Sequence, residues 1–135
     1  MTKRLAIILP IIVILAVFTC VYADKINITT TSRQFLESHN MEERLSCMTI
    51  DARANMVQNR HMSSIKPVDG QNLTYMEPII HGRTASIEVN DATDGSTRNI
   101  LLWCEDRQWR IYAVELDATD YEGHKIKTLN FEEPN

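Results

Sequence analysis

Glycine is scarce in this chain of 135 residues, and the four glycines stand alone at positions 70, 82, 95 and 123. A phosphate-binding loop needs several glycines within a few residues, so the P-loop and dinucleotide fingerprints are absent. The sequence also lacks the Ser/His/Asp signatures of hydrolases. A nucleotide-dependent enzyme is therefore not expected.

Cysteine is scarce as well, with three residues in the chain and no CxxC motif. Cys47 and Cys104 form an even pair beyond the leader. In an oxidising compartment they predict either a disulfide, worth a few kcal/mol, or two separate buried thiols. We expect no metal and no cofactor, because no two histidines stand at ligand spacing; the four are His39, His61, His81 and His124.

Basic residues are outnumbered, because the chain has 18 acidic residues against 14 basic ones and a net charge of −4. Without Lys3 and Arg4 the balance is 18 against 12, a net charge of −6. Nucleic acids and anionic lipid surfaces attract clusters of lysine and arginine. The acidic net charge of this chain therefore argues against both as partners.

One long apolar run is present, over residues 5–23 directly behind Lys3 and Arg4. A basic segment followed by an uncharged apolar run is typical of an export signal. Because the basic end stays in the cytoplasm, the chain from Asp24 onward is expected outside it.

Three fates of this leader are considered. Val21-Tyr22-Ala23 suits cleavage before Asp24, which we favour and which leaves a secreted or periplasmic domain. Alternatively, the 19 residues are retained as a single-pass anchor, since that length spans a hydrocarbon core of about 30 Å. Lipid attachment at Cys20 is a third possibility, although the bulky Phe18 fits it poorly.

Residues 24–31 are interpreted as a polar spacer between the leader and the domain. After it, Ser32 is expected to cap a short helix that carries Phe35 and Leu36. Asn40 and Glu43 resemble a capping box for the next helical segment, which is either one helix over about 41–60 or two shorter ones. Its apolar stripe comprises Met41, Leu45, Met48, Ala52 and Met56.

Beyond Pro67 and Gly70 the apolar period becomes two, which predicts strands. Strands are expected near 84–90, 98–105 and 108–117, with loops at 91–97 and at Asp106-Arg107. A weaker strand near 73–80 must lie at an edge or contain a bulge, because Pro78 cannot donate a hydrogen bond. Residues 120–135 are expected to be a polar tail.

This order predicts an α+β domain over 32–119, with N-terminal helices packed on a curved antiparallel meander of three or four strands. The strands 99–105 and 108–116, joined by Asp106-Arg107 and carrying Trp103, Trp109 and Arg110, resemble the last hairpin of the nuclear-transport-factor-2-like (SnoaL-like, cystatin-like) superfamily. That resemblance implies a cone-shaped sheet around the helices. Its members range from isomerases and cyclases to ligand binders and dimerisation modules.

Candidate site residues fall into two groups. Trp103 and Trp109 are candidates for an aromatic binding wall, beside which Arg110 would clamp an anionic ligand. For catalysis, Glu115 shares a face with Trp109 and Ile111 by simple alternation, so it is the candidate acid, with Tyr112 or His81 as its partner. Asn27 and Asn72 each begin a glycosylation triplet.

The sequence therefore favours an exported, non-enzymatic binding or interaction module at the cell envelope, acting through a small ligand, a homodimer or an envelope protein. The alternatives are a small isomerase or hydrolase-like enzyme, and a membrane-anchored structural protein. Membrane contact is expected only through residues 5–23, if they are retained.

Overall fold

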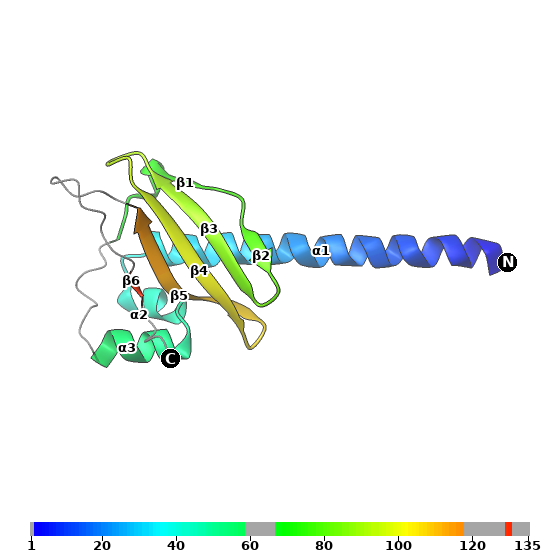
Figure 1. The fold of residues 1–135 in the computed structure, drawn as a ribbon, viewed down its shortest axis with the longest axis horizontal. Helices are drawn as coiled ribbons and strands as arrows, with labels where there is room; N and C mark the ends of the chain where they lie inside the picture. Colours follow the sequence, from blue (N-terminus) through cyan, green and yellow to red (C-terminus); the bar gives the residue numbers. More distant parts are fainter. Residues whose placement is uncertain (1, 59–66, 118–128, 131–135) are drawn as a thin grey trace.

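Helices precede strands in the computed structural model, which describes residues 2–58, 67–117 and 129–130. Figure 1 shows one long helix that lies along a twisted sheet and projects far beyond it. The predicted α+β class is confirmed. The elements are α1 (Thr2–Glu37), α2 (Met41–Ser46), α3 (Ile50–Gln58), the short 3-10 helix η2 (Gly70–Asn72), β1 (Leu73–Tyr75), β2 (Ile79–His81), β3 (Thr84–Asp91), β4 (Thr97–Glu105), β5 (Gln108–Asp117) and β6 (Leu129–Asn130).

Helix α1 continues without a break from the apolar run into the folded domain. The expected spacer at 24–31 is therefore wrong, because these residues are helical and Ile28 is fully buried. Ser32 does not cap a helix either; it lies inside α1 and is also fully buried. Ile28, Ser32, Phe35 and Leu36 recur at spacings of four, three and one, and they form the stripe that faces the sheet.

The second helical segment consists of two short helices, as one of the two expectations stated. The side-chain oxygen of Asn40 accepts from the amide of Glu42 and caps α2. The predicted stripe holds in its middle, since Met48 and Ala52 are fully buried, whereas Met41 is exposed.

The buried Arg44 of α2 closes the end of α1. Its Nε donates to the carbonyl oxygen of Phe35 at 2.8 Å, and its guanidinium carbon lies 5.5 Å from the centre of the Phe35 ring. A cation at the C-terminal end of a helix is stabilised by the helix dipole. This contact explains how a charged side chain is accommodated in the core.

The sheet is an antiparallel meander in the order β1-β3-β4-β5-β6, with β2 also paired to β3. β1 and β2 pair with the two ends of the same strand and together form one interrupted edge. Three residues, Met76 to Pro78, lie opposite Ile87 and Glu88, so the interruption is a bulge. The expectation that Pro78 lies at an edge or a bulge is confirmed.

Strands β4 and β5 form the predicted hairpin, turned by Asp106 and Arg107 with φ of 49° and 63°. Positive φ at both central residues fits a type I′ turn, whose twist matches that of the strands. Further along, the register shifts between Leu101 and Leu102, where Tyr112 is the extra residue on β5. This bulge inverts the in-out alternation of β5 beyond Tyr112.

The core lies between α1 and the inner face of the sheet. Phe35 and Ile28 of α1 are buried against Ile87, Ile100 and Ile111, the inner positions of β3, β4 and β5. The side of the sheet that faces α1 is thus occupied by side chains of the chain itself. The full cluster is Ile28, Phe35, Leu36, Cys47, Met48, Ala52, Leu73, Ala85, Ile87, Val89, Ile100, Leu102, Trp109, Ile111 and Val114.

Candidate binding clefts beside the last hairpin

The two tryptophans lie on opposite faces of the sheet and do not form one wall. Trp103 pairs across the strands with Arg110 and is 41% exposed, whereas Trp109 pairs with Cys104 and faces inward at 6% exposed. Residues directly opposite in an antiparallel pair share a face, and successive residues alternate. Each tryptophan lines a different cleft.

The first cleft, which we call the tryptophan cleft, has a volume of about 410 Å³. Its aromatic sides are Trp103 and Tyr112, and the guanidinium carbon of Arg83 lies 5.8 Å from the centre of the Trp103 ring. Glu105, at the end of β4, accepts from the amide of Ile50 at 3.3 Å and so joins α3 to the hairpin. The lining residues are Thr49, Asp51, Thr84, Trp103, Glu105 and Tyr112.

The second cleft, which we call the arginine cleft, has a volume of about 440 Å³ and lies between α1, the end of α2 and the start of β5. Its charged members are Arg107 and Arg110, and none of the described residues that line it is acidic. The remaining side chains are mostly amides and hydroxyls. The lining residues are Asn27, Thr30, Thr31, Gln34, Ser46, Cys47, Arg107, Gln108, Trp109 and Arg110.

Hydrogen bonds fix the wall of the arginine cleft. Arg110 donates to the carbonyl oxygen of Ser46 and, at 2.7 Å, to Oε1 of Gln108. Trp109 donates from Nε1 to Asp24, which is not a lining residue, at 3.1 Å. These contacts connect β5 to α2 and to the first domain residue of α1. The structure thus brings together two of the predicted ligand residues, Trp109 and Arg110.

The candidate catalytic residues are not brought together. Glu115 is exposed and accepts from Asn99 at 3.2 Å, because the bulge at Tyr112 removes it from the inner face. His81 is exposed at the end of β2, opposite Thr84, whose own partner on β4 is Trp103. Asn99 and Trp103 are four residues apart, about 13 Å along the strand at 3.3 Å per residue. Glu115 and His81 therefore lie near different ends of the sheet.

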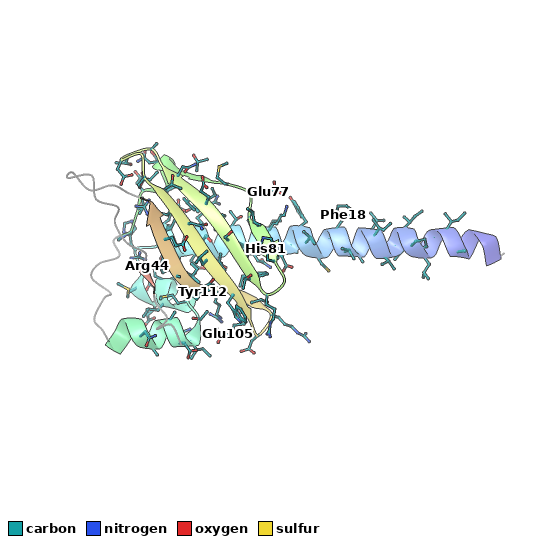
Figure 2. All side chains as sticks on the ribbon, in the orientation of Figure 1. Phe18, Arg44, Glu77, His81, Glu105 and Tyr112 are labelled. Atoms are coloured by element: carbon teal, nitrogen blue, oxygen red, sulfur yellow. The ribbon has the colours of Figure 1, made fainter. Side chains whose placement is uncertain are left out.

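Tyr112 is half-buried and lines the tryptophan cleft together with Glu105, near which Figure 2 labels it. His81 is not among the described residues that line this cleft. The expectation that Glu115 shares a face with Trp109 and Ile111 is wrong. Counting alternate residues fails here because a single extra residue changes the phase of every later position on the strand.

The predicted disulfide is not formed, since Cys47 and Cys104 are both free. Cys104 stands opposite Trp109, whereas Cys47 meets β5 two residues further on, where its carbonyl oxygen accepts from the amide of Ile111. That offset is about 6.6 Å along the strand. The Cys47 thiol donates to the carbonyl oxygen of Glu43 instead, and burial raises the pKa of this thiol.

Sequence reasoning missed the α1 side of the arginine cleft, which is formed by Asn27, Thr30, Thr31 and Gln34. The first three fall within the predicted spacer, and the sequence indicates no role for Gln34. The spacing between Ile28, Phe35 and Leu36 was the available signal, because it is helical and places the residues between them on an exposed face.

Among the described residues, no group of three or more His, Cys, Asp or Glu side chains is placed to hold a metal ion. Comparisons with protein-family models, curated proteins and solved structures gave no match to this chain. The superfamily resemblance of the last hairpin therefore stays a prediction. The clefts have to be interpreted from their own chemistry.

Proposed function

We propose that this chain is an exported, non-enzymatic binding or interaction module that the first half of α1 holds at a membrane. The observation that carries this proposal is the continuity of α1. The same helix is apolar and exposed over its first half and packed in the domain core over its second half.

The first half of α1 fits a membrane in length and composition. Its large apolar side chains are exposed, for example Ile7 at 65% and Phe18 at 70%, and Figure 2 shows Phe18 well away from the sheet. α1 is the one helix among the described residues that is long and apolar enough to cross a bilayer. This is the form of a signal sequence or of a single membrane anchor. We favour the anchor, because α1 continues unbroken through Ala23 into the domain.

The filled core supports binding rather than catalysis. A reaction chamber on the inner face of the sheet would need space and an acid or a base on its wall. That space is filled by α1, and among the described residues Asp91 is the single buried carboxylate. Asp91 is already engaged, since it pairs with Arg98 at 3.1 Å and accepts from the amide of Thr93 at 2.9 Å.

Export and retention are tested together by a carboxyl-terminal reporter that is active only outside the cytoplasm, followed by fractionation and by intact mass of the mature protein. We expect an active reporter in the membrane fraction and a mass that includes residues 1–23. Replacing Ile11 and Ile14 with lysine should disfavour insertion by about 5–7 kcal/mol, at about 2.5–3.5 kcal/mol for each charge near the helix centre.

The matched control places the same two charges on the domain surface, as Ile50→Lys with Ile79→Lys, where the side chains are 62% and 57% exposed. This pair should leave membrane retention unchanged. An inactive reporter would contradict export. A soluble product whose mass begins at Asp24 would support export and refute the anchor.

A further inference from the structure

We propose that the arginine cleft binds a phosphate group, and that its position on the molecule suits the phosphate of a lipid in the membrane that holds α1. The inference rests on the proposed anchoring of α1 for the source of the phosphate. The phosphate chemistry itself depends only on the cleft.

The lining of the cleft suits a phosphate. Arg107 and Arg110 supply two fixed positive charges, and guanidinium groups match phosphate oxygens with parallel hydrogen bonds. Asn27, Gln34 and Gln108 add amide donors, and Thr30 and Thr31 add hydroxyl groups. The chain as a whole is acidic, so a cleft lined by two arginines and by no described acid is a local departure from its average charge.

The wall that carries the arginines is held in place. Arg110 is oriented by Ser46 and Gln108, and Arg107 stands in a turn whose two central residues have positive φ. A charged group that is already oriented, as Arg110 is, loses less conformational entropy when a ligand binds.

The position of the cleft along α1 favours a membrane lipid as the source of the phosphate group. Asn27 lies four residues beyond Ala23, the last residue of the apolar run, which is about 6 Å at 1.5 Å per residue. The headgroup layer on each side of a bilayer is about 5–8 Å thick. In Figure 1 the β4–β5 turn, which holds Arg107, lies at the end of the sheet nearest the projecting half of α1. The mouth of the cleft would therefore lie at the level of the lipid phosphates.

The chain carries its own probe, because Trp109 lines the cleft and Trp103 is the only other tryptophan. In the full-length Trp103→Phe protein, fluorescence reports on Trp109 alone. Two arms distinguish the sources of phosphate. In neutral detergent the protein is titrated with glycerol 3-phosphate, and in nanodiscs it is compared between phosphatidylcholine alone and an equal mixture with phosphatidylglycerol.

We expect a saturable change of Trp109 emission in at least one arm, weakened by added salt. In the same background, Arg107→Gln and Arg110→Gln should each weaken binding about tenfold or more, since hydrogen bonds to charged groups are among the stronger ones. Arg107→Lys should restore part of it. Arg83→Gln is the matched control, because Arg83 packs on the side chain at position 103 and is not among the described residues that line the arginine cleft.

A response to glycerol 3-phosphate supports the phosphate site whether or not α1 is an anchor, so this arm does not depend on the proposed function. A response confined to phosphatidylglycerol supports the lipid as the source. No saturable response in either arm, from protein with a cooperative unfolding transition, refutes the inference. Equal weakening of binding by Arg83→Gln and Arg107→Gln refutes the cleft as the site. Because Arg107 lies on an exposed turn, its substitution should not unfold the protein, so a loss of binding can be assigned to the lost arginine.

Discussion

The two halves of α1 are one helix with two different surroundings. Over residues 6–23 the large apolar side chains are exposed, and over 24–37 the buried residues form a single stripe against the sheet. A helix that is apolar all round needs an apolar solvent, whereas an amphipathic one needs a protein core on one side. The change occurs at Asp24 and Lys25, which contact Trp109 and Glu77 of the domain.

This difference between the two halves of α1 does not come from a break in the helix. No loop or proline separates the two halves, and Pro10 lies inside the first of them. The division lies in what surrounds the side chains, so matched substitutions in the two halves should have opposite consequences.

The largest contrast is expected between two phenylalanines. Phe35 is buried, and Arg44 packs on its ring, so Phe35→Ala should lower the free energy of unfolding of the domain by about 3–5 kcal/mol. Phe18→Ala removes the same group from the exposed half and should change it by less than about 0.5 kcal/mol. Denaturant unfolding of the full chain in neutral detergent measures both. Equal losses of stability in the two variants would contradict the distinction between the two halves of α1.

Substitutions of two hydroxyl side chains, one in each half of α1, should differ less in their effect on stability, and the buried one should increase it. The fully buried Oγ of Ser32 has no hydrogen-bond partner in the described structure, whereas Thr19 donates to the carbonyl of Leu15 at 2.8 Å. Ser32→Ala should raise the stability of the domain by about 1 kcal/mol, because it removes an unsatisfied polar group. Thr19→Ala should leave that stability unchanged. A loss of stability in Ser32→Ala would show that the hydroxyl has a partner.

The smallest expected difference is between substitutions of a cysteine in the domain core and one in the first half of α1, and it concerns stability at alkaline pH. Burial raises the pKa of the Cys47 thiol, so the folded state holds this proton more tightly than the unfolded state. Its stabilising effect is present below the ordinary cysteine pKa of about 8.5 and is lost as the pH rises through the folded-state pKa. Burial and the nearby Glu37 also raise the pKa of Tyr75, which adds to the same decline.

Unfolding measured from about pH 7 to pH 10 should therefore show falling stability, and Cys47→Ala should flatten part of that slope. Cys20→Ala, in the first half of α1, is the matched control for the loss of a thiol outside the domain core. An unchanged slope in Cys47→Ala would mean that the thiol does not contribute to the alkaline loss.

The fold was predictable where the period was regular. Ala85, Ile87 and Val89 alternate with polar residues, and β3 is paired over that segment as expected. The turn at Asp106 and Arg107 was also predictable, because two polar residues separate two strand-like runs. The leader was the clearest feature of all, since an uncharged apolar run of that length behind two basic residues is typical of an export signal or an anchor.

Two features escaped the sequence for identifiable reasons. Threonines 29–31 are poor helix formers, but they continue a helix that already runs through residues 5–23. This continuation also buries Ile28 and Phe35, so tertiary packing outweighs local propensity. The bulge at Tyr112 leaves no compositional trace, and it reversed the face predicted for Glu115. The arginine cleft was half predictable, since β5 was placed correctly and α1 was not.

The interrupted edge at Met76 to Pro78 limits how this protein can assemble. A straight, exposed edge strand is a template on which a second chain can extend a sheet. Here the amide of Met76 already donates to the carbonyl of Glu88, Pro78 has no amide hydrogen, and β1 and β2 are three residues each. Two copies of the chain are therefore kept from pairing strand to strand along this edge, and any pairing between them has to use other surfaces.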